Sequence, residues 1–147
     1  MHRRRKTREL CMKILYAYRF ENMQQDIIEF YKRFRELNQN EDFKDVDEKY
    51  LEKLLKGVIQ NQQIIDNLIA KYSKDWPLNR LPMVELELMR IAVYELLFEE
   101  DVPVSVAIDE AVDMASIFGI EKAPSFVNGI LGRIAENEVK RSKNHDD

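Results

Sequence analysis

The sequence predicts an all-α protein. Its apolar residues recur at the three- and four-residue spacing of helices with one buried face, and not in the alternation that marks a strand. Only four glycines and four prolines interrupt the 147 residues. A hydrophobic content of 45% is enough for one core without a metal or a disulfide. We therefore expect a compact bundle of about six or seven helices, arranged in two halves of three or four helices each.

The first half is expected to cover about residues 1–74. Its first helix would span 4–21 and its second 25–38, both with apolar residues at helical spacing. A third helix is expected to run without a break from about 45 to 73, because its leucines and isoleucines form one stripe. The segment DWPLNRLP follows, and its prolines disfavour helical geometry in the residues before them. We expect this segment to join the two halves.

The second half is expected to cover about residues 75–136. A helix after Pro82 is apolar all round, which predicts a position in the middle of a bundle. The next helix follows the DVP segment and ends at Gly119, a favourable C-terminal cap residue. A last helix begins near Pro124. The charged tail, residues 137–147, is expected to fray, and the whole chain to form a single helical domain.

Positive charge is concentrated at the N-terminus. Residues 1–19 carry a net charge of +6, although the whole chain carries −4. Because the cluster continues into an amphipathic helix, its side chains should be held at a fixed place on the surface. This asymmetry indicates an anionic partner and favours nucleic acid, and a solvated tail is the alternative. The cluster consists of Arg3, Arg4, Arg5, Lys6 and Arg8.

A helical projection places Tyr16 opposite the apolar face of the first helix. That apolar face holds Leu10, Cys11, Ile14, Ala17 and Tyr18, whereas Arg5, Arg8, Met12 and Arg19 surround Tyr16. An exposed tyrosine among arginines favours an interface, and packing beneath another helix is the alternative. Arginine both binds phosphate and stacks on unpaired bases, so this surface suits single-stranded RNA.

No catalytic, metal-binding or cofactor-binding set is expected. The two histidines, His2 and His145, lie near opposite ends, and the single cysteine, Cys11, falls on the apolar face of the first helix. Glu95 lies in the apolar central helix, where a satisfied structural carboxylate is favoured over a proton carrier. No uncharged apolar run approaches the ~20 residues of a membrane span, and we expect a cytoplasmic protein.

Three segments, in order and spacing, resemble the NusB family of bacterial transcription antitermination factors. They are RRRKTRELCMKILY, LNRLPMVELELMRIAVYELLFEEDVPVSVAIDEAVDMASIFG and FVNGIL. The resemblance covers nearly the whole chain and is weakest at about 22–50 and after 136. It implies a two-part helical fold, a heterodimer with the ribosomal protein NusE, and binding of the single-stranded boxA element of ribosomal RNA leaders.

The resemblance also implies roles for individual residues. RNA contacts fall on the five basic residues named above and on Lys122, Phe126 and Asn128, although KAPS at 122–125 departs from the family's usual acidic or polar residue followed by serine. For Phe126, core packing and a base-facing role are both open. NusE contacts fall on Tyr16 and on Glu85, which the projection places at the polar margin of the central helix.

These expectations together describe a non-enzymatic RNA-binding factor. It would bind boxA RNA with NusE and couple it, through NusE and other Nus factors, to the RNA polymerase antitermination complex. The alternative is a helical protein-binding scaffold that makes no direct contact with RNA, and an enzyme ranks third.

Overall fold

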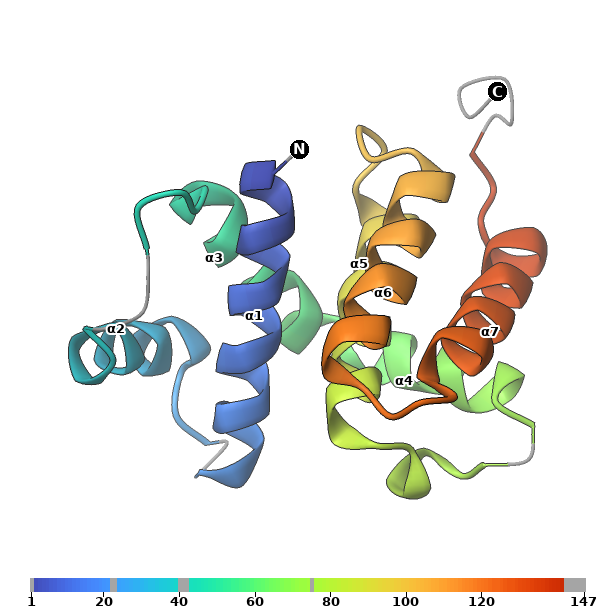
Figure 1. The fold of residues 1–147 in the computed structure, drawn as a ribbon, viewed down its shortest axis with the longest axis horizontal. Coiled ribbons are helices and arrows are strands. Elements are labelled where there is room, and N and C mark those ends of the chain that lie inside the picture. Colours follow the sequence, from blue (N-terminus) through green and yellow to red (C-terminus); the bar gives the residue numbers. More distant parts are fainter. Residues whose placement is uncertain (1, 22–23, 40–42, 75, 142–147) are drawn as a thin grey trace. The chain divides into compact units, whose positions relative to one another are not determined.

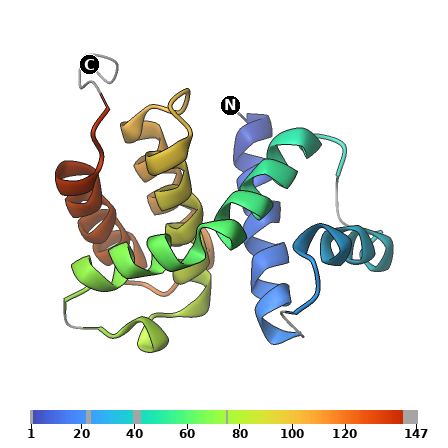
Figure 2. The same cartoon turned by 180° about the vertical axis from the view of Figure 1, so that it is seen from behind.

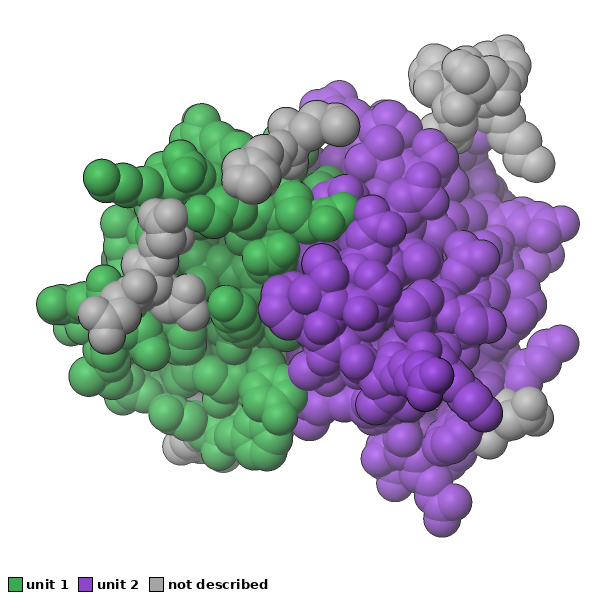
Figure 3. Space-filling view, viewed as in Figure 1, with its two compact units in different colours: residues 1–60 green, residues 61–147 purple. Residues whose placement is uncertain are grey.

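The computed structural model describes all residues except 1, 22–23, 40–42, 75 and 142–147. Within the described residues it holds seven α-helices, one short 3-10 helix and no strand (Figure 1). The chain divides into two compact units, residues 1–60 and 61–147, which Figure 3 distinguishes by colour. The expected all-α class and the expected number of helices are confirmed.

Unit 1 consists of α1 (His2–Phe20), α2 (Ile27–Leu37) and α3 (Glu48–Gln60). Each of these helices packs against the other two, and α3 crosses α1 when seen from behind (Figure 2). Helix α2 begins where it does because the Asp26 carboxylate accepts hydrogen bonds from the N–H groups of Ile28 and Glu29, at 2.8 and 3.2 Å. The core of the unit holds fully buried aliphatic side chains, among them Ile14, Leu15, Leu51, Leu54 and Leu55.

Unit 2 consists of α4 (Gln62–Tyr72), the 3-10 helix η1 (Leu78–Arg80), α5 (Met83–Phe98), α6 (Val104–Phe118) and α7 (Ala123–Glu138). Helices α5, α6 and α7 pack against one another, and α4 lies across α5 and α7 (Figures 1 and 2). Every residue of α5 from Glu85 to Leu96 is buried, which confirms the expected central position of this helix. Among the described residues, no helix has the length and apolar character needed to cross a membrane.

The structure separates α3 from α4, where the sequence predicted one helix over 45–73. Asn61 lies between them with φ −109° and ψ 18°, and its carbonyl oxygen accepts the first backbone hydrogen bond of α4, from Ile65 at 3.0 Å. Apolar periodicity continues on both sides of this residue, so the pattern could not reveal the break. The two units therefore divide at residues 60–61, whereas the sequence placed the joint near residue 74.

Of the tail expected to fray, residues 142–147 lie outside the described residues, whereas residues 137–141 are described. Helix α7 extends to Glu138, and beyond it the Arg141 guanidinium donates hydrogen bonds to backbone carbonyls at and after the end of α5. The acceptors are Glu95 at 2.8 Å, Leu96 at 3.1 Å, Glu100 at 3.2 Å and Val102. The Glu95 carbonyl also accepts the Glu99 N–H, so Arg141 is a second donor to it. The positive charge of Arg141 also interacts favourably with the negative end of the α5 dipole.

The centre of unit 2 contains a charged network. The Arg90 guanidinium donates two hydrogen bonds to the Asp66 carboxylate, at 2.8 and 3.0 Å, and a third to Glu87 at 2.9 Å. Arg90 and Glu87 are buried, and such charges are tolerated only when they are paired and hydrogen-bonded. This network therefore fixes α5 to α4 within the unit.

Candidate nucleic-acid and partner interfaces

The basic residues at the start of α1 differ in their exposure. We call Arg3, Arg4, Arg5, Lys6 and Arg8 the basic arm. Arg3 is exposed, and Arg4, Arg5 and Lys6 are half-buried. All five lie in a regular helix, so the arm is part of the folded unit and not a free tail.

Thr7, at the centre of the arm, ties it to the start of α3. Its hydroxyl donates a hydrogen bond to the Arg3 carbonyl oxygen at 2.7 Å and accepts one from the Asp47 backbone N–H at 2.9 Å. The Asp47 carboxylate in turn accepts from the Tyr50 N–H at 3.0 Å, at the first turn of α3. Thr7 is fully buried. Sequence reasoning missed this residue, because one threonine in an amphipathic stretch carries no distinctive pattern.

Two cations of the arm already contact side chains of the same unit. The Arg4 guanidinium lies 3.6 Å from the centre of the Tyr50 ring, a cation–π contact that orients it. The Lys6 ammonium lies 3.8 Å from the Asp45 carboxylate, and ion pairs this exposed contribute little stability.

Arg8 and Met12 correct the helical projection. The projection placed both beside Tyr16 on an outward stripe, but Arg8 is only 3% exposed and Met12 is buried. The covered arc of α1 is wider than a single apolar stripe, since Leu15 is fully buried as well. Among the five basic residues, Arg8 is thus the least accessible, and its contact with RNA stays a prediction.

Tyr16 faces outward as expected, with 37% of its surface exposed. One turn further along α1, Phe20 is 68% exposed, and the two ring centres lie 4.9 Å apart. Large exposed aromatic side chains side by side are typical of interface centres. The sequence analysis named Tyr16 but missed Phe20, although its spacing of four residues places it on the same face.

Glu85 is not at an exposed margin of α5, so that expectation is wrong. It is 1% exposed, and its carboxylate accepts a hydrogen bond from the Ile120 N–H at 2.9 Å. The turn between α6 and α7 covers it, with Gly119 directly over the carboxylate. The projection considered α5 alone and could not include the turn that covers it. Contact between Glu85 and NusE stays a prediction.

The start of α7 presents the other residues implied by the resemblance. Lys122 and Asn128 are exposed, and Phe126 is half-buried. Phe126 lines an open pocket of about 800 Å³ that Trp76 lines as well. Phe126 is therefore neither wholly in the core nor wholly on the surface, and a base-facing role stays open to it.

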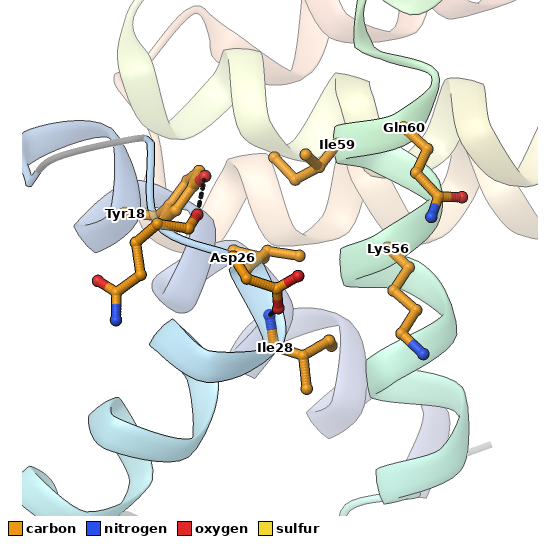
Figure 4. A pocket seen from close by; sticks show the side chains of 8 residues that line it. Tyr18, Asp26, Ile28, Lys56, Ile59 and Gln60 are labelled. Atoms are coloured by element: carbon orange, nitrogen blue, oxygen red, sulfur yellow. Dashed lines mark hydrogen bonds between the residues drawn. The ribbon is translucent and has the colours of Figure 1, made fainter.

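A second concavity lies in unit 1. It has a volume of about 380 Å³ and lies between α3 and the chain before α2 (Figure 4). The Tyr18 hydroxyl at its edge donates to the Gln25 carbonyl oxygen at 2.7 Å, and Asp26 caps α2, so these two of its polar residues serve local structure. No metal-binding group of three or more His, Cys, Asp or Glu occurs among the described residues. The side chains of His2 and His145 lie outside that part.

Comparisons with known proteins agree with these features. The model of the NusB family matches residues 5–136. The transcription antitermination protein NusB of Caldicellulosiruptor saccharolyticus is 77% identical over 130 residues, which cover 88% of this chain and 99% of that protein. The solved structure of T. maritima NusB matches with a TM-score of 0.81 at 36% identity, over 97% of this chain and 96% of that one.

A chain of a further solved structure, a complex of the antitermination factors NusB and NusE with double-stranded RNA, matches with a TM-score of 0.77. Its identity is 28%, and the match covers 92% of this chain and 98% of that chain. Sequence and fold thus agree over almost the full length, and the chain belongs to the NusB family.

Proposed function

We propose that this chain is a transcription antitermination factor that binds single-stranded boxA RNA together with NusE. Relatives of this chain are named transcription antitermination proteins. The structure of one relative was solved as a complex with NusE and RNA. In this role the chain links the RNA, through NusE and other Nus factors, to the antitermination complex of RNA polymerase. It acts in the cytoplasm, where bacterial RNA is made.

The observation that carries this proposal is the basic arm on a fixed helix. Because the Thr7 hydroxyl holds the Arg3 carbonyl and the start of α3, the cations project from an ordered backbone. Less conformational entropy is then lost when they bind a polyanion. Phosphate contacts supply affinity, and the exposed Arg3 with the half-buried Arg5 and Lys6 are the cations we assign to them.

Base recognition is assigned to the start of α7, where Lys122, Phe126 and Asn128 lie within about two helical turns. Single-stranded RNA exposes base faces and edges, which aromatic and amide side chains can contact. We assign NusE to the surface formed by Tyr16 and its neighbour Phe20, and we retain Glu85 as a further contact whose role needs the test described in the Discussion.

The proposed activity is binding and not catalysis. Family membership supports this, since the relatives are named for antitermination. In the unit 1 pocket, the Tyr18 hydroxyl and the Asp26 carboxylate form hydrogen bonds that shape the backbone. A turnover assay with RNA substrates that yielded a product would contradict this part of the proposal.

A salt series tests the RNA-binding role. Each phosphate contact to a single strand contributes about −0.7 to the slope of log K against log salt, so replacing Arg3, Arg5 and Lys6 by alanine should flatten the slope by up to about 2.1. Arg4 and Arg8 are left in place, because one packs on Tyr50 and the other is buried. Binding is measured on a boxA-bearing single strand, with and without NusE.

A matched control removes the same charge from exposed positions outside the arm, with Lys32, Lys53 and Lys56 replaced by alanine. It should keep the wild-type slope. If both variants keep that slope, the arm does not bind RNA and the scaffold hypothesis is favoured. A duplex of the same sequence serves as competitor, and preference for the duplex would contradict the assignment to single-stranded RNA.

A further inference from the structure

The pocket beside Phe126 is open, largely apolar and built from segments far apart in the sequence. It is lined by Trp76, Leu81 and Pro82, before α5, and by Ile120 and Phe126 around the start of α7. Its volume of about 800 Å³ lies within the range of ~300–1,000 Å³ that small-molecule sites occupy, and is ample for one nucleotide. We call it the Trp76 pocket.

Trp76 is exposed although its own backbone is hydrogen-bonded to Ser73. Its side chain is 55% exposed, a large apolar surface for a single residue. The Ser73 hydroxyl donates a hydrogen bond to the Trp76 carbonyl oxygen at 2.7 Å, and the Trp76 N–H donates to the Ser73 carbonyl oxygen at 3.1 Å. These two hydrogen bonds join the Trp76 backbone to Ser73 at the end of α4. Packing in the core of unit 2 does not explain a tryptophan at this position, since more than half of the Trp76 surface faces solvent.

The polar groups of the pocket suit a base better than an aliphatic ligand. Lys122 provides a cation for a phosphate that enters with the base, and Ser125 provides a hydroxyl. Glu121 adds a carboxylate, which repels phosphate but accepts a hydrogen bond from the amino group of a base. Aromatic faces together with one cation and a few hydrogen-bonding groups are the combination that binds unstacked bases.

We propose that the Trp76 pocket receives one unstacked base of the bound single-stranded RNA, with the Trp76 indole as its stacking surface. The inference rests on the proposed function and extends it to a residue outside the FVNG motif. Lys122 and Phe126, already assigned to RNA, also line this pocket, so the site is continuous with that surface.

Trp76 is the only tryptophan of the chain, which gives a direct readout. The free protein is titrated with a boxA-bearing single strand while indole fluorescence is recorded, and the anisotropy of a labelled copy of the same RNA reports binding independently. Base stacking on the indole should quench its fluorescence with the same midpoint as the anisotropy change. Binding by anisotropy without a change in indole fluorescence would overturn the inference and leave the proposed function intact.

Substitutions add a second measurement. A stacked base contributes ~1–3 kcal/mol, so Trp76→Ala should weaken RNA binding by about five- to 150-fold, whereas Trp76→Phe should retain most of the affinity. Phe98→Ala is the matched control, because Phe98 is another exposed aromatic residue of unit 2, 44% exposed, outside the pocket. Wild-type affinity in Trp76→Ala, or an equal loss in Phe98→Ala, would overturn the inference.

Abasic substitution identifies the base. An RNA lacking one base at a time should show one position at which affinity falls in the wild type but not further in Trp76→Ala, since the two changes remove the same contact. Full additivity at every position would overturn the inference. Absence of any RNA binding by the wild-type chain, with and without NusE, would overturn the proposed function and this inference together.

Discussion

The Glu85 carboxylate of α5 and the Ile120 backbone N–H are joined by a 2.9 Å hydrogen bond across 35 residues of sequence. This contact fixes the turn between α6 and α7 on the first turn of α5. The same turn leads into the segment that holds Lys122 and Phe126. Glu85 therefore positions the proposed RNA surface whether or not it also contacts a partner.

Gly119 has no space for a side chain at this contact. A Cβ atom there would lie 2.7 Å from the Glu85 carboxylate oxygen Oε2, 2.8 Å from the Ala115 carbonyl oxygen and 2.9 Å from the Ala123 Cβ. We expect Gly119→Ala to lower the free energy of unfolding by about 1–3 kcal/mol, because two of these three neighbours cannot move without the backbone. Urea denaturation measures the change.

Gly132→Ala is the control for that substitution. Gly132 lies within α7, and no atom would meet an added Cβ within 4 Å. Alanine in a helix interior should raise the free energy of unfolding by about 0.5–1 kcal/mol. If both variants were stabilised, the close packing at Gly119 would not exist in solution.

Much of the fold follows from apolar spacing, because helices bury one face in a periodic way. The uninterrupted apolar character of α5 predicted its central position, and every residue from 85 to 96 is buried there. Periodicity does not detect a change of direction that preserves the pattern. For this reason the break at Asn61 was missed, and with it the division between the units.

The exposure of the candidate site residues could be predicted only where the position on a single helix determines it. Tyr16 is exposed, as its position on α1 predicted, whereas Glu85 and Arg8 are buried by packing that a single-helix projection omits. The Trp76 pocket requires two segments about 45 residues apart to meet. No local pattern in either segment contains that information.

The ion pair between Arg90 and Asp66 should contribute strongly to the stability of unit 2. Asp66→Ala leaves the buried Arg90 guanidinium without its bidentate acceptor, and removing one partner of a buried pair costs about 3–5 kcal/mol. The loss should fall near the lower limit of that range, because Asp66 is only half-buried. Thermal unfolding measures it. Lys71→Ala, which breaks the exposed ion pair with Glu138, should change stability far less, and an equal loss would contradict the assignment.

Thr7 should position the basic arm through its hydroxyl. Thr7→Val keeps the shape but leaves the Asp47 N–H without its acceptor, which costs about 1–3 kcal/mol of stability for a buried group. RNA affinity should also fall while the fold persists, because the start of α1 is released from α3. Thr7→Ser retains the hydroxyl and should behave as the wild type in denaturation and in RNA titration. Weak RNA binding by Thr7→Ser would show that the methyl group matters instead.

Protonation of the Glu138 carboxyl should remove a stabilising contribution at the end of α7 in acid. Hydrogen bonds from the Tyr72 hydroxyl at 2.6 Å and from Lys71 at 3.0 Å lower the pKa of its carboxyl below the ordinary value. A carboxyl whose pKa is lower in the folded state stabilises the fold above its unfolded pKa, and this contribution disappears as the pH falls through the folded pKa. Tyr72→Phe should raise the Glu138 pKa.

Carboxyl carbon NMR across an acid titration measures that pKa. Tyr16→Phe, which removes a hydroxyl from unit 1, is the control and should leave the Glu138 titration unchanged. The stability difference between the wild type and Tyr72→Phe should shrink as Glu138 becomes protonated. A difference that persists below the folded pKa would show that the Tyr72 hydroxyl acts through another group.

Glu85→Gln separates a structural role of Glu85 from a direct role in NusE binding. The glutamine side-chain carbonyl can still accept the Ile120 hydrogen bond, but the negative charge is gone. If an arginine of NusE pairs with Glu85, affinity should fall by about tenfold or more, since hydrogen bonds between charged groups contribute ~1.5–3 kcal/mol. Unchanged NusE affinity in Glu85→Gln, with weaker binding in Glu85→Ala, would leave only the positioning of the turn to this residue.

Tyr16 and Phe20 should form the aromatic centre of the NusE surface. Their rings touch and both are exposed, so truncation removes partner contacts without emptying the core. Interface aromatics often contribute 2 kcal/mol or more, and Tyr16→Ala or Phe20→Ala should therefore weaken NusE binding roughly thirtyfold. Calorimetric titration with NusE measures this, and Phe98→Ala is the exposed aromatic control.

Because the pair lies at the far end of α1 from the basic arm, RNA binding by the free chain should stay unchanged. Wild-type NusE affinity in both variants would remove this surface from the proposal, and an equal loss in RNA affinity would show that the two surfaces are not separate.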